Sequence, residues 1–179
     1  MQTIPEHIPD IKALRGHKIT PELLNLLSRY VVFPKSARDL IRLIGLDAAS
    51  LLVTAWGGQV FRVPAVQGGA KEAGEKAYQK LVEIIGEEAA HAIVKEYRGT
   101  LLSVPNLTIA LHAYVQDTVR NEFDVMVTLG GLSSTEAVFE LGIKHRMAGK
   151  TIEKIVNKPL NPTIDTESLR LDPIFKGVT

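Results

Sequence analysis

Residues 148–151, Ala-Gly-Lys-Thr, are of the types that end a phosphate-binding loop. In such a loop, glycines let backbone N–H groups surround the phosphates, and the lysine neutralises their charge. The loop needs its first glycine five positions before the second, but Lys144 stands there and Gly142 comes two residues too early. The preceding residues, STEAVFELG, have the period of a helix and not that of a buried strand. The pattern therefore disfavours a nucleotide-binding loop.

Positive charge is concentrated around these same residues. The whole chain has a formal net charge of +1, whereas residues 142–158 contain five basic side chains and one acidic side chain, Glu153. Such a local excess is typical of a surface that contacts phosphate, and it also occurs on helical hairpins whose lysines only keep them soluble. The sequence leaves both interpretations open.

The elements that must position the basic residues are predicted to be two short helices. Residues 133–136, Ser-Ser-Thr-Glu, form a capping box that begins a helix after the pair Gly130-Gly131. A helix-turn-helix needs a small residue where the helices touch, an apolar residue after the turn and two apolar anchors on the second helix. Residues at the spacings of the DNA-binding motif meet these needs: Gly142, Met147, Ile152 and Ile155.

The second helix is predicted from about Gly149 to Asn157, with Ala148 as a poor N-cap. On it and on the preceding turn, basic side chains are expected to bind mainly phosphates, while Thr151 and Asn157 are candidates for base edges. The predicted DNA-binding residues are Lys144, Arg146, Lys150, Thr151, Lys154, Asn157 and Lys158.

An internal repeat precedes this region. Residues 44–64, IGLDAASLLVTAWGGQVFRVP, align with residues 85–105, IGEEAAHAIVKEYRGTLLSVP, at eight identical positions. In each copy the Ile-Gly pair is expected to stop one helix before the next begins. The repeated unit is predicted to be helix, Gly, helix, Gly, short strand and Pro.

The two predicted strands cover residues 59–63 and 100–104. A lone strand of five residues needs a partner for its backbone groups. The strands can pair with each other, giving a pseudo-dimer within one chain, or across a homodimer, or lie separately against helices. The residues expected to take part in pairing are Gly58, Gln59, Phe61, Val63, Gly99, Leu102 and Val104.

The fold predicted from these elements is mainly α-helical with short β-strands. An apolar stripe at helical spacing predicts a long helix of about 22 residues after Pro105; it comprises Leu107, Leu111, Val115, Val119, Phe123 and Met126. We divide the chain into an N-terminal segment with one helix (1–35), the helix-strand region (36–105), a linking helix (106–131), the helix-turn-helix (132–158) and a C-terminal tail (159–179) in which Ile174 and Phe175 are expected to dock.

Composition argues against several classes of function. The chain is 45% hydrophobic and 23% charged, which is ordinary for a globular protein, and no apolar run is long enough to span a membrane. With no cysteine, no close spacing of its five histidines and no nucleophile motif, we expect no metal, no cofactor and no enzymatic activity. We interpret the histidines as surface or boundary residues and expect the protein in the cytoplasm of a bacterial host cell.

The order of these elements resembles the Mor family of phage transcription activators. The similarity covers about residues 36–158 and is most specific in residues 57–64, GGQVFRVP, and in the placement of the C-terminal helix-turn-helix. It implies a phage or prophage regulator that dimerises through its N-terminal region, binds promoter DNA and helps to recruit host RNA polymerase. The chain departs from the family pattern in having two helix-strand units, Arg146 where Gly is common in the turn, and Ala148 in place of a hydroxyl cap.

Two functions are therefore expected from the sequence. The first is a Mor-like, DNA-binding transcriptional regulator. The alternative is a phage-encoded protein-interaction module that has the same fold but no longer reads DNA sequence.

Overall fold

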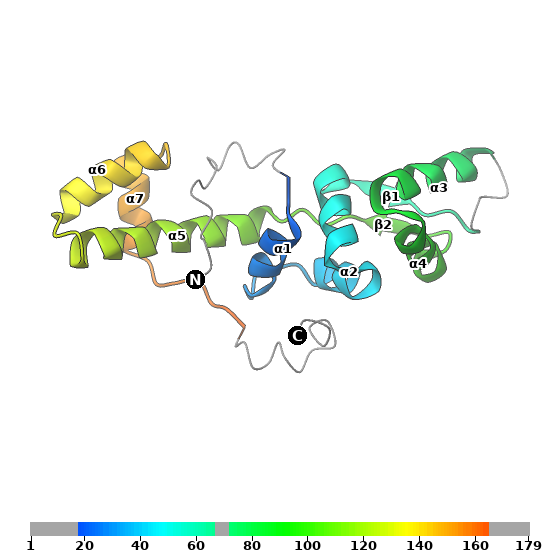
Figure 1. The fold of residues 1–179 in the computed structure, drawn as a ribbon, viewed down its shortest axis with the longest axis horizontal. Coiled ribbons are helices and arrows are strands. Elements are labelled where there is room, and N and C mark those ends of the chain that lie inside the picture. Colours follow the sequence, from blue (N-terminus) through cyan, green and yellow to red (C-terminus); the bar gives the residue numbers. More distant parts are fainter. Residues whose placement is uncertain (1–17, 67–71, 165–179) are drawn as a thin grey trace. The chain divides into compact units, whose positions relative to one another are not determined.

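The computed structural model describes residues 18–66 and 72–164 of the chain. In this part of the chain the structure is mainly helical, with one small two-stranded sheet, which confirms the predicted fold class at that level (Figure 1). The expected docking of Ile174 and Phe175 falls outside the described residues. By packing, the described chain divides into two units, residues 18–107 with 163–164 and residues 108–162.

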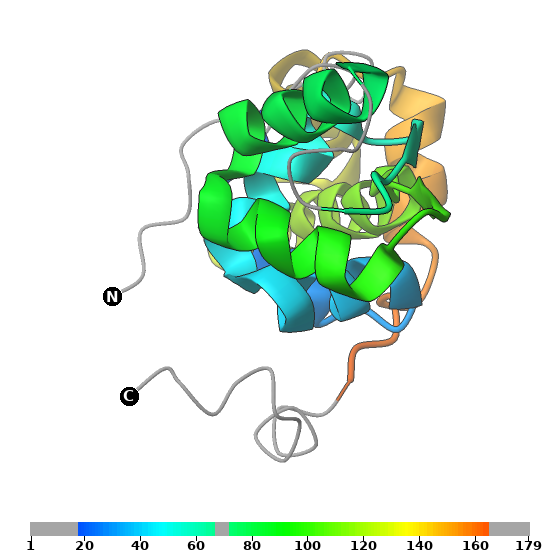
Figure 2. The same cartoon turned by 90° about the vertical axis from the view of Figure 1, so that its right-hand side faces the viewer.

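The first unit contains four helices and both strands. Its helices are α1 (Pro21–Ser28), α2 (Lys35–Trp56), α3 (Glu72–Ile85) and α4 (Glu87–Tyr97). The last three pack against one another, and α1 packs on α2 (Figure 2). Their apolar faces form the core of the unit, whose fully buried side chains include Leu24, Leu40, Leu52, Leu81 and Ile93.

Glycines bend the chain at two equivalent places in the aligned segments. Gly45 interrupts α2 with φ 80° and ψ 168°, and Gly86 separates α3 from α4 with φ 81° and ψ 166°. This backbone region is open essentially to glycine alone. The Ile-Gly pairs therefore end one helical segment and start the next, as the sequence predicts.

The strands β1 (Val60–Arg62) and β2 (Leu101–Ser103) pair antiparallel within the chain, with Phe61 opposite Leu102. They are shorter than the predicted five residues, although backbone hydrogen bonds of 2.9 and 3.0 Å continue the ladder at each end, from Val104 to Gln59 and from Val63 to Thr100. Gly58 and Gly99 lie just before the paired residues. The Phe61 ring stacks on Trp56 with centroids 4.8 Å apart, while Leu102, Val63 and Val104 are buried.

The second unit consists of three helices, α5 (Thr108–Thr128), α6 (Ser134–Lys144) and α7 (Gly149–Val156). Each of them packs against the other two (Figure 1). The helix α5, which the sequence predicts as a linking helix, therefore supplies one wall of the core that holds α6 and α7. After α7, residues 157–162 complete this unit. Thr163 belongs to the first unit, where it forms a β-bridge with Tyr30.

Candidate nucleic-acid interface

The apolar stripe of α5 provides the surface on which α6 and α7 are fixed. Val115 and Val119 are buried against Leu141 of α6 and against Ile152 and Ile155 of α7. Phe123, Met126, Val138, Met147 and Val156 pack around this cluster. Ile152 and Ile155 thus lie on the inner side of α7, as expected for the anchors of a second helix, and they orient its other side towards solvent.

The start of α6 is fixed by the predicted capping box, which the structure confirms. The Ser133 hydroxyl accepts from the backbone N–H of Glu136 at 3.3 Å, and the Glu136 carboxylate accepts from the backbone N–H of Ser133 at 2.9 Å. The Ser133 hydroxyl also donates to the Glu136 carboxylate at 2.7 Å, and this bond, followed by that from the Ser133 N–H, holds the pKa of Glu136 below its ordinary value. Two amides at the helix start are satisfied in this way.

The turn between α6 and α7 has the hydrogen bonds of a Schellman motif. The N–H of Met147 donates to the carbonyl of Gly142 at 3.0 Å, and the N–H of Arg146 donates to that of Ile143 at 3.3 Å. A Cβ on Gly142 would lie 3.1 Å from the Met147 carbonyl oxygen, closer than ordinary contact. A small residue is therefore needed at 142 because the turn folds back onto it.

Arg146 occupies the position of this motif that usually holds glycine, with φ 51°. The sequence shows Arg146 only as a departure from the Gly that is common in the turn, and the structure places it in the left-handed conformation. It costs a residue with a Cβ about 1 kcal/mol or more, so the turn is strained at a residue that adds positive charge beside α7.

We expect Arg146→Gly to raise the free energy of unfolding of the second unit by about 1 kcal/mol, because glycine adopts this conformation without the Cβ penalty. Chemical denaturation followed by hydrogen exchange in residues 108–162 measures the change. Arg146→Ala is the matched control, since it removes the same charge but keeps the Cβ. Equal stability of the two variants would contradict the strain.

The helix α7 presents its polar face to solvent. Its N-cap, Ala148, has no side-chain hydrogen bond to the helix start, so the amides of Gly149 and Lys150 have no capping side chain, whereas the Thr151 amide donates to the Ala148 carbonyl at 2.8 Å. The exposed side chains on this helix and its end include Lys150, Thr151, Lys154, Asn157 and Lys158. The structure therefore brings these five predicted residues together on and just after one short helix, opposite Ile152 and Ile155.

Lys144 differs from the other predicted phosphate ligands because it already has a partner. Its ammonium donates to the Glu122 carboxylate of α5 at 2.9 Å. The other Glu122 oxygen lies 2.7 Å from Nε2 of His145, whose side chain is buried. Our interpretation of the histidines as surface or boundary residues is wrong for His145, because packing of the turn against α5 covers it.

The contacts with Lys144 and His145 lower the pKa of the Glu122 carboxyl group. Partial burial raises the pKa of its carboxyl, but the hydrogen bonds and charges of Lys144 and His145 outweigh that effect and lower the pKa below its ordinary value of 4.5. The depressed pKa means that the folded state favours ionised Glu122. This contribution to stability is present above the pKa of the unfolded chain and is lost as pH falls through the lower folded pKa.

Accordingly, Glu122→Gln should reduce stability at pH 6 and have a smaller effect at pH 3, where the wild-type carboxyl is also becoming protonated. Denaturation midpoints of residues 108–162 at both pH values, followed by hydrogen exchange, measure the difference. The exposed residue Glu140 on α6 gives the control, Glu140→Gln. A loss on Glu122→Gln that is the same at pH 3 and pH 6 would rule out the ionised carboxylate as its cause.

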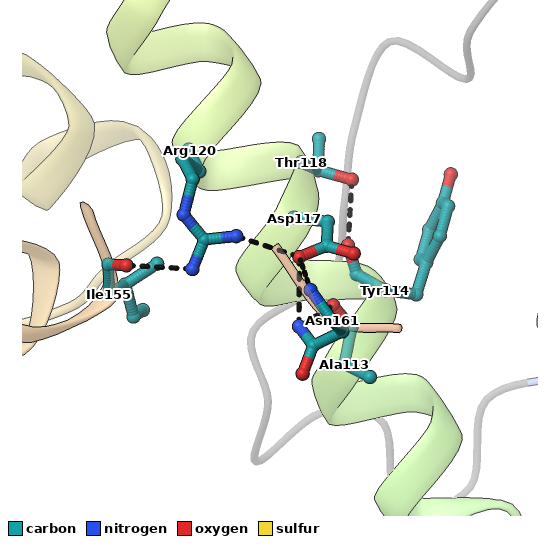
Figure 3. A network of polar contacts seen from close by, with 7 residues as sticks. All are labelled: Ala113, Tyr114, Asp117, Thr118, Arg120, Ile155 and Asn161. Atoms are coloured by element: carbon teal, nitrogen blue, oxygen red, sulfur yellow. Dashed lines mark hydrogen bonds and ion pairs between the residues drawn. The ribbon is translucent and has the colours of Figure 1, made fainter. Parts of the chain in front are cut away.

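A second polar network fixes the end of α7 (Figure 3). Arg120 is only 6% exposed; its guanidinium donates at 2.8 Å to Asp117 and at 2.8 Å to the carbonyl of Ile155. Asp117 also accepts from the backbone and side-chain nitrogens of Asn161, at 3.1 and 2.8 Å. Of the buried side-chain nitrogen and oxygen atoms in the described residues, only Nε of Arg120 has no hydrogen-bond partner.

Sequence reasoning missed this network and the role of Asn161. The available signal was the pair Asp117 and Arg120, at i and i+3 next to the apolar stripe of a helix. Polar residues beside a buried stripe need partners, but the sequence did not show that these would come from Ile155 and Asn161.

No three His, Cys, Asp or Glu side chains in residues 18–66 and 72–164 are grouped as they would be to hold a metal ion. Within the same ranges, no helix has both the length and the apolar character needed to cross a membrane.

Comparison of the chain with protein-family models, curated proteins and solved structures found no match. The resemblance to the Mor family therefore stays a prediction.

Proposed function

We propose that the chain is a DNA-binding transcriptional regulator that uses α6 and α7 as a helix-turn-helix. One observation carries the proposal: α7 is anchored through Ile152 and Ile155 and exposes Lys150, Thr151 and Lys154 on its outer side. An anchored short helix with exposed cationic and hydrogen-bonding side chains suits the major groove of DNA. Apolar anchoring fixes the direction in which these side chains point.

Different residues take different roles in this proposal. Lys150, Lys154 and Lys158 bind backbone phosphates, and the uncapped N-terminus of α7 adds backbone N–H donors for the same anion. Arg146 contributes a further cation from the turn. Thr151 and Asn157 carry the groups that can read base edges. Lys144 contributes less, because a phosphate would compete with Glu122 for its ammonium.

The resemblance of the sequence to the Mor family supports a phage or prophage origin and action on promoter DNA together with host RNA polymerase. We further propose that the intrachain pairing of β1 with β2 replaces, within one chain, a strand pair that two subunits make in the family. In that case one chain carries one helix-turn-helix, and a palindromic operator is not required.

Fluorescence anisotropy with labelled duplex DNA at several salt concentrations tests the proposal. Four free phosphate contacts, or five with Lys144, predict a slope of log K against log salt between about −3.5 and −4.5. Competition with unlabelled promoter fragments then separates specific from general binding. The absence of any salt-sensitive binding would sink the proposal.

A second candidate function is a protein-interaction module, which the outer surface of α6 favours. Phe139 and Ile143 lie one helical turn apart and are 65% and 61% exposed. Large apolar side chains in such positions often mark contacts with another protein. For this function, Phe139→Ser with Ile143→Ser abolishes partner capture in a pull-down, whereas Lys150→Ala leaves it unchanged; the reverse result would reject it.

A further inference from the structure

A surface hollow in the first unit is the strongest remaining site. It has a volume of about 330 Å³, and the described residues that line it are Val66, His91, Val94, Lys95 and Arg98. Three of these residues belong to α4, Arg98 is its C-cap, and Val66 follows β1. Neither the α6–α7 turn nor any residue proposed to bind DNA takes part.

The fold builds this hollow from two segments that are distant in sequence. Hydrogen bonds from Val63 N–H to the Thr100 carbonyl and from Gly99 N–H to the Pro64 carbonyl, at 3.0 and 3.4 Å, hold the exit of β1 beside the end of α4. On α4, His91 and Lys95 stand at i and i+4 and so share one face of the helix, and the C-cap residue Arg98 lines the same hollow. The sheet register thus fixes one side of the hollow and the helix fixes the other.

The lining combines positive charge with apolar surface. Lys95 and Arg98 are cationic, His91 offers ring nitrogens, and no carboxylate occurs among the described lining residues. Val94 is buried and forms an apolar wall together with Val66. No hydrogen bond or ion pair within residues 18–66 and 72–164 occupies the Lys95 or Arg98 side chain, so both can reach an outside anion.

The helix end explains only part of this arrangement. A basic residue in the last turn complements the helix dipole, which accounts for Lys95. The helix dipole does not account for His91, a further hydrogen-bonding side chain one turn earlier, or for the hollow itself. The last-turn carbonyl of Tyr97 already accepts from the Thr100 amide and hydroxyl, at 2.9 and 2.6 Å, so it does not need Arg98 as a cap.

We propose that this hollow binds a small organic anion with an apolar body and a phosphate or carboxylate head. Lys95 and Arg98 bind the head, the Arg98 guanidinium in two-pronged fashion, and His91 donates one further hydrogen bond. The apolar body lies on Val66 and Val94. The volume is at the lower end of the range for small-molecule sites, so the ligand is of about one ring with its anionic group.

The test is an NMR titration of the full ¹⁵N-labelled chain with phenyl phosphate, benzoate, inorganic phosphate and phenol. Saturable amide shifts confined to residues 91–98 and 63–66 are expected with phenyl phosphate or benzoate, and the tighter of the two identifies the head group. Inorganic phosphate should bind the same residues more weakly, and phenol should not saturate. Saturation by phenol equal to that by both anions, or shifts spread over α7 as much as α4, would overturn the proposal.

The variant Lys95→Gln with Arg98→Gln should weaken binding of phenyl phosphate and benzoate at least tenfold, because both charged hydrogen bonds to the head are lost. Lys80→Gln, an exposed charge change on α3, is the control and should leave affinity unchanged. Unchanged affinity in the double variant would also overturn the site. The double variant should bind DNA with the wild-type affinity. A failure of the hollow to bind anions can therefore be distinguished from a failure of the chain to bind DNA.

Discussion

Replacing both Lys150 and Lys154 with Ala should lower the affinity of the chain for duplex DNA by roughly 60-fold at 0.1 M salt. Each lysine that neutralises a phosphate releases close to one counterion, and at this salt concentration each release favours binding by a factor of roughly eight. The slope of log K against log salt should become shallower by about 1.8. Anisotropy titrations at four or more salt concentrations measure both quantities.

The control for this experiment has the same change in net charge elsewhere. Lys35→Ala with Lys80→Ala removes two exposed cations from α2 and α3. If binding depends on a specific face of α7, this control should keep most of the affinity and slope. Equal losses in the two double variants would mean that DNA responds to net charge and not to α7. Thermal melts should match the wild type in both, because all four side chains are exposed.

Replacing Arg120 with Met should lower the free energy of unfolding of the second unit by about 3 to 5 kcal/mol. Met roughly fills the volume of the Arg stem but leaves Asp117, which is 8% exposed, without its cationic partner. It also leaves the Ile155 carbonyl without the donor that joins α7 to α5. Breaking a buried pair on one side is costly because the remaining charge stays buried.

Hydrogen exchange resolved to residues 108–162 is the suitable measurement, because the two units need not unfold together. The single Trp of the chain, Trp56, lies in the other unit, and its fluorescence transition should move little.

The double variant Asp117→Asn with Arg120→Met should recover part of the loss, since it removes the uncompensated charge. The comparison is Lys76→Met, which breaks the exposed pair with Glu72 and should cost less than 1 kcal/mol. A similarly small effect for Arg120→Met would mean that the network stabilises nothing.

The features predicted best from the sequence depend on neighbours along the chain. The capping box at Ser133 and the interruptions at Gly45 and Gly86 each rest on backbone preferences within a few residues. The stripe of α5 was also visible, since helical periodicity is a local property. The departure at Arg146 from the Gly common in this turn was also visible in the sequence, although its left-handed conformation was not.

The features that the sequence did not reveal depend on partners far along the chain. Glu122 meets His145 across 23 residues, and Asp117 meets Asn161 across 44. In the sequence these polar residues look like ordinary solvent-facing positions, whereas in the structure His145 and Asp117 are buried and Glu122 and Asn161 are partly covered. Among the predicted DNA-binding residues, Lys144 is affected most, because nothing in the nearby sequence indicates that Glu122 of α5 is its partner.

The order of the two units along the chain sets an order of synthesis. Arg29 and Tyr30 leave the ribosome early, but their backbone partners Ile164 and Thr163 follow only after all of residues 108–162 have been made. Translation runs from the N-terminus, so these hydrogen bonds are not available to a nascent chain. The unit that contains residues 18–107 therefore completes its backbone contacts only after residues 108–162 have been synthesised.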